Sequence, residues 1–140
     1  MFQTFFLYEA SSFLIKENLE TNHQAIYRSN FSQQAGNFRP ITALALKNDE
    51  KIACIAIEAQ GLYKPGLEII NLNNNDQDRD NNNNNHEKKD VDLEQIRVLL
   101  HSHRANIVSI NFTRDDKYLL TLSDDRFIIW NTYDWTPLQI

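Results

Sequence analysis

The chain has 140 residues, with 19 Asp and Glu against 14 Lys and Arg, which gives a formal net charge of −5 at pH 7. This length fits one domain or a part of one. A nucleic-acid binder needs a basic surface that neutralises phosphates, so we expect no nucleic-acid partner for this acidic chain.

Short apolar runs separated by polar turns follow one another along the chain. They lie at roughly 8–12-residue spacing and lack the 3.6-residue period of a helix, so the sequence predicts an all-β fold. The best helical candidate, Val91–Leu100, is rich in β-branched residues, and we predict it as a strand. In chain order the predicted strands are Phe2–Tyr8, Phe13–Ile15, Gln24–Tyr27, Ile41–Leu46, Ile52–Ile57, Leu67–Leu72, Ile96–Leu100, Ile107–Phe112, Tyr118–Ser123, Phe127–Trp130 and Pro137–Ile140.

The cysteine count and the length of the apolar runs bear on the compartment. The chain has one cysteine, Cys54, so no disulfide can form within it. Its longest apolar run, Ile52–Ile57, has six residues, whereas a membrane-spanning helix needs about 20. The first residues lack the basic start of a secretory signal peptide and include Glu9. We therefore expect a cytoplasmic protein without membrane contact.

An asparagine-rich tract interrupts the series of strands. Residues Asn71–Asn85 read NLNNNDQDRDNNNNN, and further polar residues follow as far as Asp90. Such a tract buries too little apolar surface to offset the entropy lost on ordering it. We predict a disordered loop at Asn73–Asp90, inserted at low cost in stability.

Two segments on either side of this loop repeat one pattern. ITALALKNDEKIACIAI begins at Ile41, and IVSINFTRDDKYLLTLS begins at Ile107. Both read as an apolar strand, a turn rich in Asp or Asn, a lysine and a second apolar strand. The offset from Ile41 to Ile107 is 66 residues. Removing an insertion of about 20 residues leaves about 45, which is the period of a propeller blade.

The second of these segments resembles a WD40 repeat. Ser102–Asp116 is similar to the GH…V..V.FSPDG part of that repeat, and Lys117–Asn131 is similar to its KYLASGSDDGTIRIWD part. Ser102 replaces the first Gly, Asp116 replaces the turn Gly, and Asn131 replaces the final Asp. The turn before the last strand is also one residue short.

The resemblance implies a partial WD40-type β-propeller of about two and a half to three blades. Residues 1–30 are predicted as the last strands of a first blade without its inner strand. Residues 31–100 are predicted as a second blade that includes the loop 73–90, and residues 101–140 as a third blade with the WD-type signature. Two blade faces are then expected to be bare, lined by residues such as Phe5, Leu7, Leu119 and Ile128.

In the family that this segment resembles, a His, a strand Ser or Thr, a turn Asp and the Trp form a hydrogen-bonded tetrad within one blade. Two positions stay open here, because either of two hydroxyls and either of two aspartates fit the pattern. The candidate tetrad residues are His103, Thr121, Ser123, Asp124, Asp125 and Trp130.

Some of the same residues could instead belong to an enzyme active site or a metal site. Ser123, His103 and Asp125 contain the residue types of a hydrolase triad, but no GxSxG elbow and no Gly-rich oxyanion loop accompany them. His101 and His103 have no Cys/His set around them that is typical of a metal site. We therefore expect no catalytic residues, no metal and no cofactor.

A narrower resemblance covers most of the chain and is carried by Gly36, Pro40, Ile41–Leu46, Lys51, Ala53, Ala56 and Pro65–Leu72. In these residues the chain is similar to the first propeller of the cilia- and flagella-associated WD-repeat proteins. The resemblance implies a non-enzymatic protein-interaction scaffold in a ciliary or axonemal assembly. The bare blade faces lead to two expectations: the chain is a portion of a longer protein, or other protein chains are partners that complete the propeller. An independent small β-sandwich that binds a ligand is the alternative, and an enzyme with a grafted site is a further one.

Overall fold

The computed structural model describes residues 5–29, 39–61, 63–72, 91–99 and 103–138. All regular structure in these ranges is β-strand, and none of it is helix. Across the same residues there is consequently no helix long and apolar enough to cross a membrane. The predicted loop Asn73–Asp90 lies outside the described residues.

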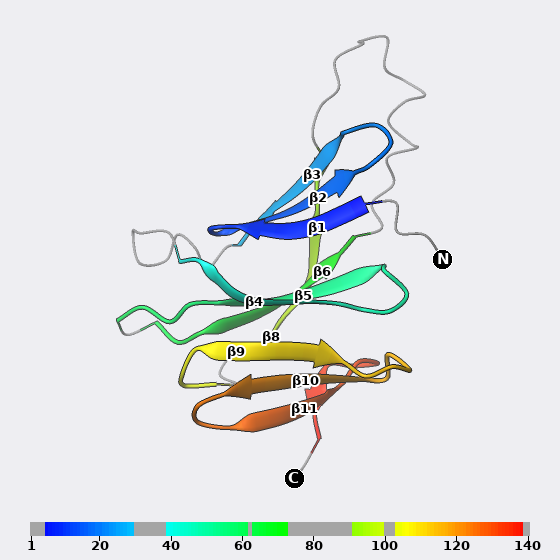
Figure 1. Ribbon diagram of the computed structural model, residues 1–140. Coiled ribbons are helices and arrows are strands. Elements are labelled where there is room, and N and C mark those ends of the chain that lie inside the picture. Colours follow the sequence, from blue (N-terminus) through cyan, green and yellow to red (C-terminus); the bar gives the residue numbers. More distant parts are fainter. Residues whose placement is uncertain (1–4, 30–38, 62, 73–90, 100–102, 139–140) are drawn as a thin grey trace.

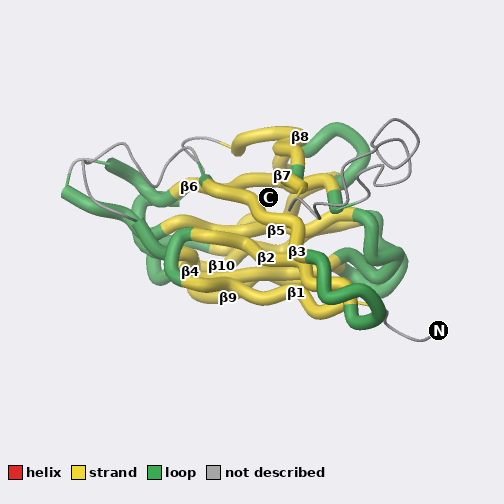
Figure 2. Tube along the Cα trace, turned by 90° about the horizontal axis from the view of Figure 1, so that it is seen from above, coloured by secondary structure: helices red, strands yellow, loops and turns green. Residues whose placement is uncertain are grey.

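The strands form three four-stranded sheets, which lie side by side in Figure 1 and are seen from above in Figure 2. All neighbouring strands are antiparallel except β3 and β7, which are parallel. Three sheets in one row are the arrangement of blades and not of a two-layer sandwich. The first sheet contains β1 (Phe5–Ala10), β2 (Phe13–Asn18), β3 (Gln24–Arg28) and β7 (Val91–Asp92); the second contains β4 (Ile41–Leu46), β5 (Ile52–Ile57), β6 (Gly66–Asn71) and β8 (Glu94–Leu99); the third contains β9 (Ile107–Phe112), β10 (Tyr118–Ser123), β11 (Phe127–Asn131) and β12 (Thr136–Pro137).

The predicted all-β fold is thus confirmed, and one predicted strand divides between two sheets. Val91–Leu100 contains β7, which pairs with β3 of the first sheet, and β8, which pairs with β6 of the second. Leu93 lies between them, is buried, and donates its N–H to the carbonyl of Ile26 (3.0 Å). A two-residue strand has no periodicity of its own, so the sequence pattern did not separate it. The boundaries proposed for the three blades stay predictions.

The internal repeat recurs in three dimensions. β4 and β9 are offset by 66 residues, and so are β5 and β10. The turns that join them match in detail, since Glu50 and Asp116 both adopt the left-handed region, at φ 63° and 62°. Asp115 uses its side chain to accept the N–H of Lys117, as Asp49 does with Lys51. Asp and Asn favour such bonds, which explains how this chain forms these turns with few glycines.

Two apolar layers fill the spaces between the sheets. Alternate residues of β5 point to opposite sides, so that Ala53, Ile55 and Ile57 pack toward the first sheet while Cys54 and Ala56 pack toward the third. All five are fully buried. A strand that is covered on both faces has no need of polar alternation. This double burial explains the unbroken apolar run that the sequence shows at Ile52–Ile57.

The prediction of which residues line the bare faces is wrong. Phe5 and Leu119 are buried, and Leu7 and Ile128 pack against the two cores. On the third sheet the opposite row of side chains points outward. Alternation along a strand defines two faces, but it does not say which of them a neighbour covers.

Candidate functional site

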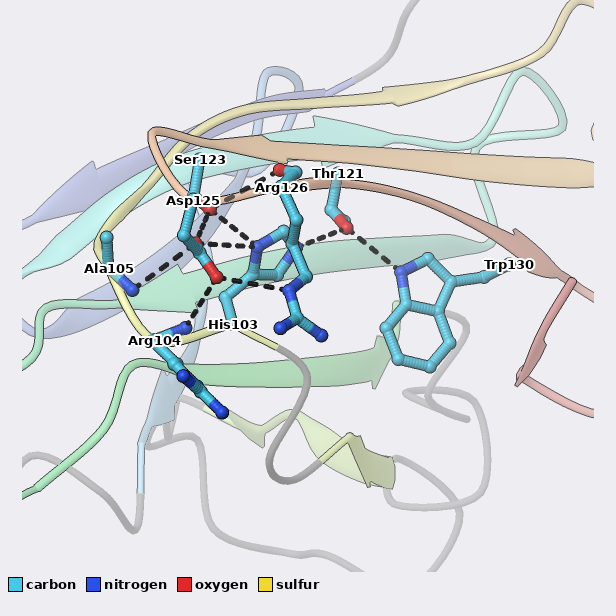
Figure 3. Close-up of polar contacts among 8 residues, drawn as sticks. All are labelled: His103, Arg104, Ala105, Thr121, Ser123, Asp125, Arg126 and Trp130. Atoms are coloured by element: carbon cyan, nitrogen blue, oxygen red, sulfur yellow. Dashed lines mark hydrogen bonds and ion pairs between the residues drawn. The ribbon is translucent and has the colours of Figure 1, made fainter. Parts of the chain in front are cut away.

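His103 is at the centre of a hydrogen-bonded chain in the third sheet (Figure 3). Its Nε2 lies 2.8 Å from Thr121 Oγ1, and its Nδ1 lies 2.7 Å from Ser123 Oγ. Trp130 donates its Nε1–H to Thr121 Oγ1 (3.0 Å), and the hydroxyl of Ser123 donates to Asp125 Oδ1. Four of these five side chains are buried. The fifth, Asp125, is the last in the series of hydrogen bonds and is exposed.

One arrangement of protons uses every donor in this chain once. The indole N–H of Trp130 goes to Thr121, whose own hydroxyl proton then goes to Nε2 of His103. The ring proton is therefore on Nδ1 and goes to Ser123, which donates in turn to Asp125. Burial lowers the pKa of His103, which favours the neutral ring that this arrangement needs. The hydrogen bond from Ser123 lowers the pKa of Asp125, which keeps it an anionic acceptor.

The structure brings together five of the six candidate tetrad residues. Both hydroxyls take part, one on each ring nitrogen of His103. Asp125 is the aspartate that joins, while Asp124 is exposed and makes no bond to the other candidates. Asp125 also accepts the backbone N–H groups of Arg104 (3.2 Å) and Ala105 (3.4 Å). It thereby ties the β10–β11 turn to the segment that leads into β9.

This geometry does not have the form of a hydrolase triad. A triad places its nucleophile and its carboxylate on opposite nitrogens of the imidazole. Here Ser123 and Asp125 both lie on the Nδ1 side, at 2.7 Å and 3.7 Å, and Thr121 occupies the Nε2 side. His103 is 1% exposed, so no substrate can reach it.

Of the two histidines considered for metal binding, the structure describes His103 alone. His101 lies outside the described residues. In the part of the chain that the structure describes, no group of three or more His, Cys, Asp and Glu side chains is placed to hold a metal ion. Cys54 is fully buried, and burial raises the pKa of its thiol, so it is a core side chain and not a nucleophile.

A second buried polar cluster, which the sequence pattern did not predict, is centred on Glu68 of β6. This carboxylate is fully buried and accepts hydrogen bonds from the hydroxyls of Tyr27 and Ser29 and from Nε2 of Gln95 (2.8 Å). Burial raises the pKa of Glu68, and the donors oppose that shift. The cluster joins β3 of the first sheet to β6 and β8 of the second. The available signal was one charged residue inside an otherwise apolar strand.

A buried arginine lies before the first strand of the second sheet. Arg39 is fully buried and donates from Nε to the carbonyl of Glu58 (2.7 Å) and from Nη2 to that of Lys64 (2.5 Å). Its guanidinium carbon also lies 5.8 Å from the centre of the Tyr63 ring. Arg39 therefore fixes the long β5–β6 connection against the start of β4.

Comparison with known proteins supports the fold and no narrower assignment. No protein-family model matches the chain, and no curated protein matches it. Among solved structures it is similar to the C-terminal WD40 domain of Sif2, with 21% identity and a TM-score of 0.62 over 97% of this chain. It is also similar to the β-propeller domain of Myceliophteria thermophila Cps50 (Swd1), with 13% identity and a TM-score of 0.60 over 98% of this chain.

The fold is that of part of a WD40 β-propeller. The chain spans about a third of the length of these two structures, at 33% and 35%. The predicted fold class is therefore confirmed, including its partial extent. WD40 propellers are typically non-enzymatic folds that present surfaces to other proteins. The function of this chain therefore has to be inferred from its own surfaces.

Proposed function

We propose that this chain is a non-enzymatic protein-interaction scaffold that forms one part of a WD40-type propeller, completed by blades of other protein chains. The observation that supports this most directly is the outer face of the third sheet. Its apolar row contains Leu120, Leu122, Phe127 and Ile129.

The internal repeat shows which row of side chains in the second sheet is equivalent to this exposed row. At the offset of 66 residues, Cys54 and Ala56 of β5 correspond to Leu120 and Leu122 of β10. The cross-strand pairs correspond as well, because Ala56 pairs with Leu67 as Leu122 pairs with Phe127.

The two equivalent rows differ in their exposure. Cys54, Ala56 and Leu67 are fully buried against the third sheet, whereas Leu122 and Phe127 are 44% and 45% exposed. Val108 on β9 is 60% exposed and extends the patch. A contiguous apolar face of this kind marks an interaction site on a soluble protein. Since a sheet covers the equivalent face in this same chain, we infer that another sheet covers this one.

We further propose that the assembly is ciliary or axonemal and that the chain acts in the cytoplasm or its ciliary cytoskeleton. The support is the narrower sequence resemblance. It includes the strand Ile41–Leu46, which is β4 in the structure, and the segment Pro65–Leu72, which contains all of β6.

A site-specific photo-crosslinker tests both proposals in one experiment. A photoreactive phenylalanine analogue is placed at Leu122 of the chain, produced in a ciliated cell, and irradiated before the axonemes are isolated. We expect a discrete adduct with a second protein in the axonemal fraction. The matched control places the same analogue at Tyr133, which is 93% exposed but lies in the β11–β12 turn. Equal crosslinking at the two positions contradicts the scaffold proposal, and an adduct found only outside the axonemes contradicts the ciliary one.

A further inference from the structure

The strands of the first sheet are shifted by one position relative to the strands of the other two sheets. In the second and third sheets, the turn after the first strand lies at one shared end, where Asn48 donates its backbone N–H to Asp116 Oδ1 (2.9 Å). The turn after β1 lies at the opposite end, because Ser11 accepts the N–H of Ile41 (2.9 Å) at the start of β4. β1 therefore runs opposite to β4 and β9, as the arrows of β1 and β9 show in Figure 1.

Strand direction alternates along an antiparallel sheet, so a reversed β1 occupies the second position and not the first. Side-chain contacts agree with this placement. Leu99 of β8, the last strand of the second sheet, belongs to the same apolar core as Trp130 of the third strand of the third sheet, and Arg97 of β8 donates to the carbonyl of Asp134, just after that strand (3.0 Å). In the same way β3 of the first sheet contacts the third strand of the second, through Tyr27 and Glu68. β1, β2 and β3 thus correspond to the second, third and fourth strands of the other sheets.

The innermost position of the first sheet, beside β1, holds no strand among the residues that the structure describes. In the other two sheets β4 and β9 fill that position. Within the described ranges, β1 is therefore an edge strand of six residues, and its free edge presents backbone N–H and C=O groups to which no other described strand is paired. On its outer side, Phe6 is 57% exposed and Tyr8 is 37% exposed.

We propose that the edge of β1 binds an extended strand of another polypeptide, which runs antiparallel to β1 and parallel to β4. The proposal deepens the scaffold function and rests on it, since it names the form that one partner takes. In this binding mode the main-chain hydrogen bonds supply affinity and the alternate side chains supply specificity.

The two strands that occupy this position elsewhere define the chemistry of the ligand. β4 reads ITALAL and β9 reads IVSINF, so both are uncharged six-residue strands. Ile41 and Ile107 are buried at the start of each, and small or polar residues follow at Ala43 and Ser109. The expected ligand is an uncharged strand with a branched apolar first residue and a small or polar third residue.

A peptide with the sequence of residues 105–114, which contains β9, is the probe. It is added to the full 140-residue chain, and backbone hydrogen exchange is followed residue by residue. With the peptide at ten times its Kd, we expect exchange of exposed amides at residues 5–10 to slow by about tenfold. The edges at β7 and β12 are expected to exchange as before.

Two N-methylated forms of this peptide provide matched controls. One carries methyl groups on the odd-numbered residues and the other on the even-numbered residues, so each form blocks one hydrogen-bonding edge. Because only one edge of a strand faces β1, we expect one form to bind and the other to fail. Unchanged exchange at residues 5–10, slowing at another edge instead, or equal binding of both forms overturns the proposal. The crosslinking result at Leu122 does not depend on this edge, so the scaffold proposal can stand where this one fails.

Discussion

At the scale of single residues, Trp130 has two separate roles in the third sheet. Its ring belongs to the apolar layer between the second and third sheets, while its Nε1–H begins the hydrogen-bonded chain through Thr121 and His103. Loss of the ring leaves a cavity, and loss of the N–H alone removes one donor from a buried chain.

Substitutions at Trp130 separate these two roles. Trp130→Ala is expected to lower the free energy of unfolding by about 3–5 kcal/mol, because it creates a cavity and removes the donor. Trp130→Phe keeps most of the apolar contact and should cost about 1–2 kcal/mol. Urea unfolding of both variants measures the difference. Equal losses would show that the hydrogen bond and the indole shape, and not the buried volume, dominate.

Glu68 is expected to make the stability depend on pH. Burial raises its folded pKa above the ordinary value, so above about pH 4.5 the folded state binds more protons than the unfolded state. Stability then falls as the pH rises through that window toward the folded pKa. Glu68→Gln removes this titration, so its melting temperature should fall less than that of the wild type between about pH 5 and about pH 8. Thermal unfolding at both pH values measures it.

The control for this experiment is Glu94→Gln, the same chemical change at an exposed position of β8. We expect its pH profile to follow that of the wild type. If Glu68→Gln keeps the wild-type profile as well, Glu68 does not titrate in the window.

The two polar clusters differ in how much the sequence could reveal. The chain around His103 follows a spaced motif within about 30 residues, so its members could be predicted. The shortened turn left Asp124 and Asp125 equivalent in the sequence, and only the backbone geometry separates them. The partners of Glu68 lie 41, 39 and 27 residues away at Tyr27, Ser29 and Gln95. No local pattern connects these residues, because their proximity depends on how the first two sheets pack.

At the scale of elements, the turns β4–β5 and β9–β10 have the same backbone conformation but differ in the hydrogen bonds that their side chains make. Glu50 and Asp116 share the left-handed conformation. Asp116 accepts the backbone N–H groups of Asn48 (2.9 Å) and Asp49 (3.1 Å) and also the side-chain amide of Asn48 (2.9 Å). Among the residues that the structure describes, Glu50 makes one hydrogen bond, from its backbone N–H to the carbonyl of Lys47 (2.9 Å).

A pair of glycine substitutions tests this difference. Both relieve about 1 kcal/mol of left-handed strain, and both add a similar entropy to the unfolded chain. Glu50→Gly should therefore stay within about 0.5 kcal/mol of the wild type. Asp116→Gly also loses the bonds between the two turns and should be destabilised by about 1–2 kcal/mol. Chemical denaturation of the two variants checks this, and equal stability would mean that the Asn48–Asp116 contact contributes nothing.

The strands could be predicted from the sequence to within a few residues, because their apolar alternation is local. The side that a strand presents to the neighbouring sheet could not be predicted in this way. The prediction of which residues line the bare faces was therefore wrong. β7 was not separated either, since Val91 and Asp92 become a strand only through their pairing with β3.

At the scale of the whole molecule, neighbouring sheets are held together by both apolar and polar contacts. The second and third sheets share an apolar layer together with polar bonds, such as that from the Thr42 hydroxyl to the carbonyl of Ile107 (2.9 Å). The first and second sheets share an apolar layer, the Glu68 cluster and the continuous segment from β7 to β8. The middle sheet is thus the one that both neighbours stabilise.

The position of β7 in the chain sets an order for events during synthesis. β1, β2 and β3 leave the ribosome first, at about 5–20 residues per second. The strand that pairs with β3 on its other side, β7, is complete only when Val91 and Asp92 emerge, after β6 and the whole asparagine-rich tract. Until then both edges of the nascent three-stranded sheet are open, at β1 and at β3. A growing chain with two open edges is prone to pair with its neighbours on the same messenger RNA, so the long polar tract delays the very strand that covers the edge at β3.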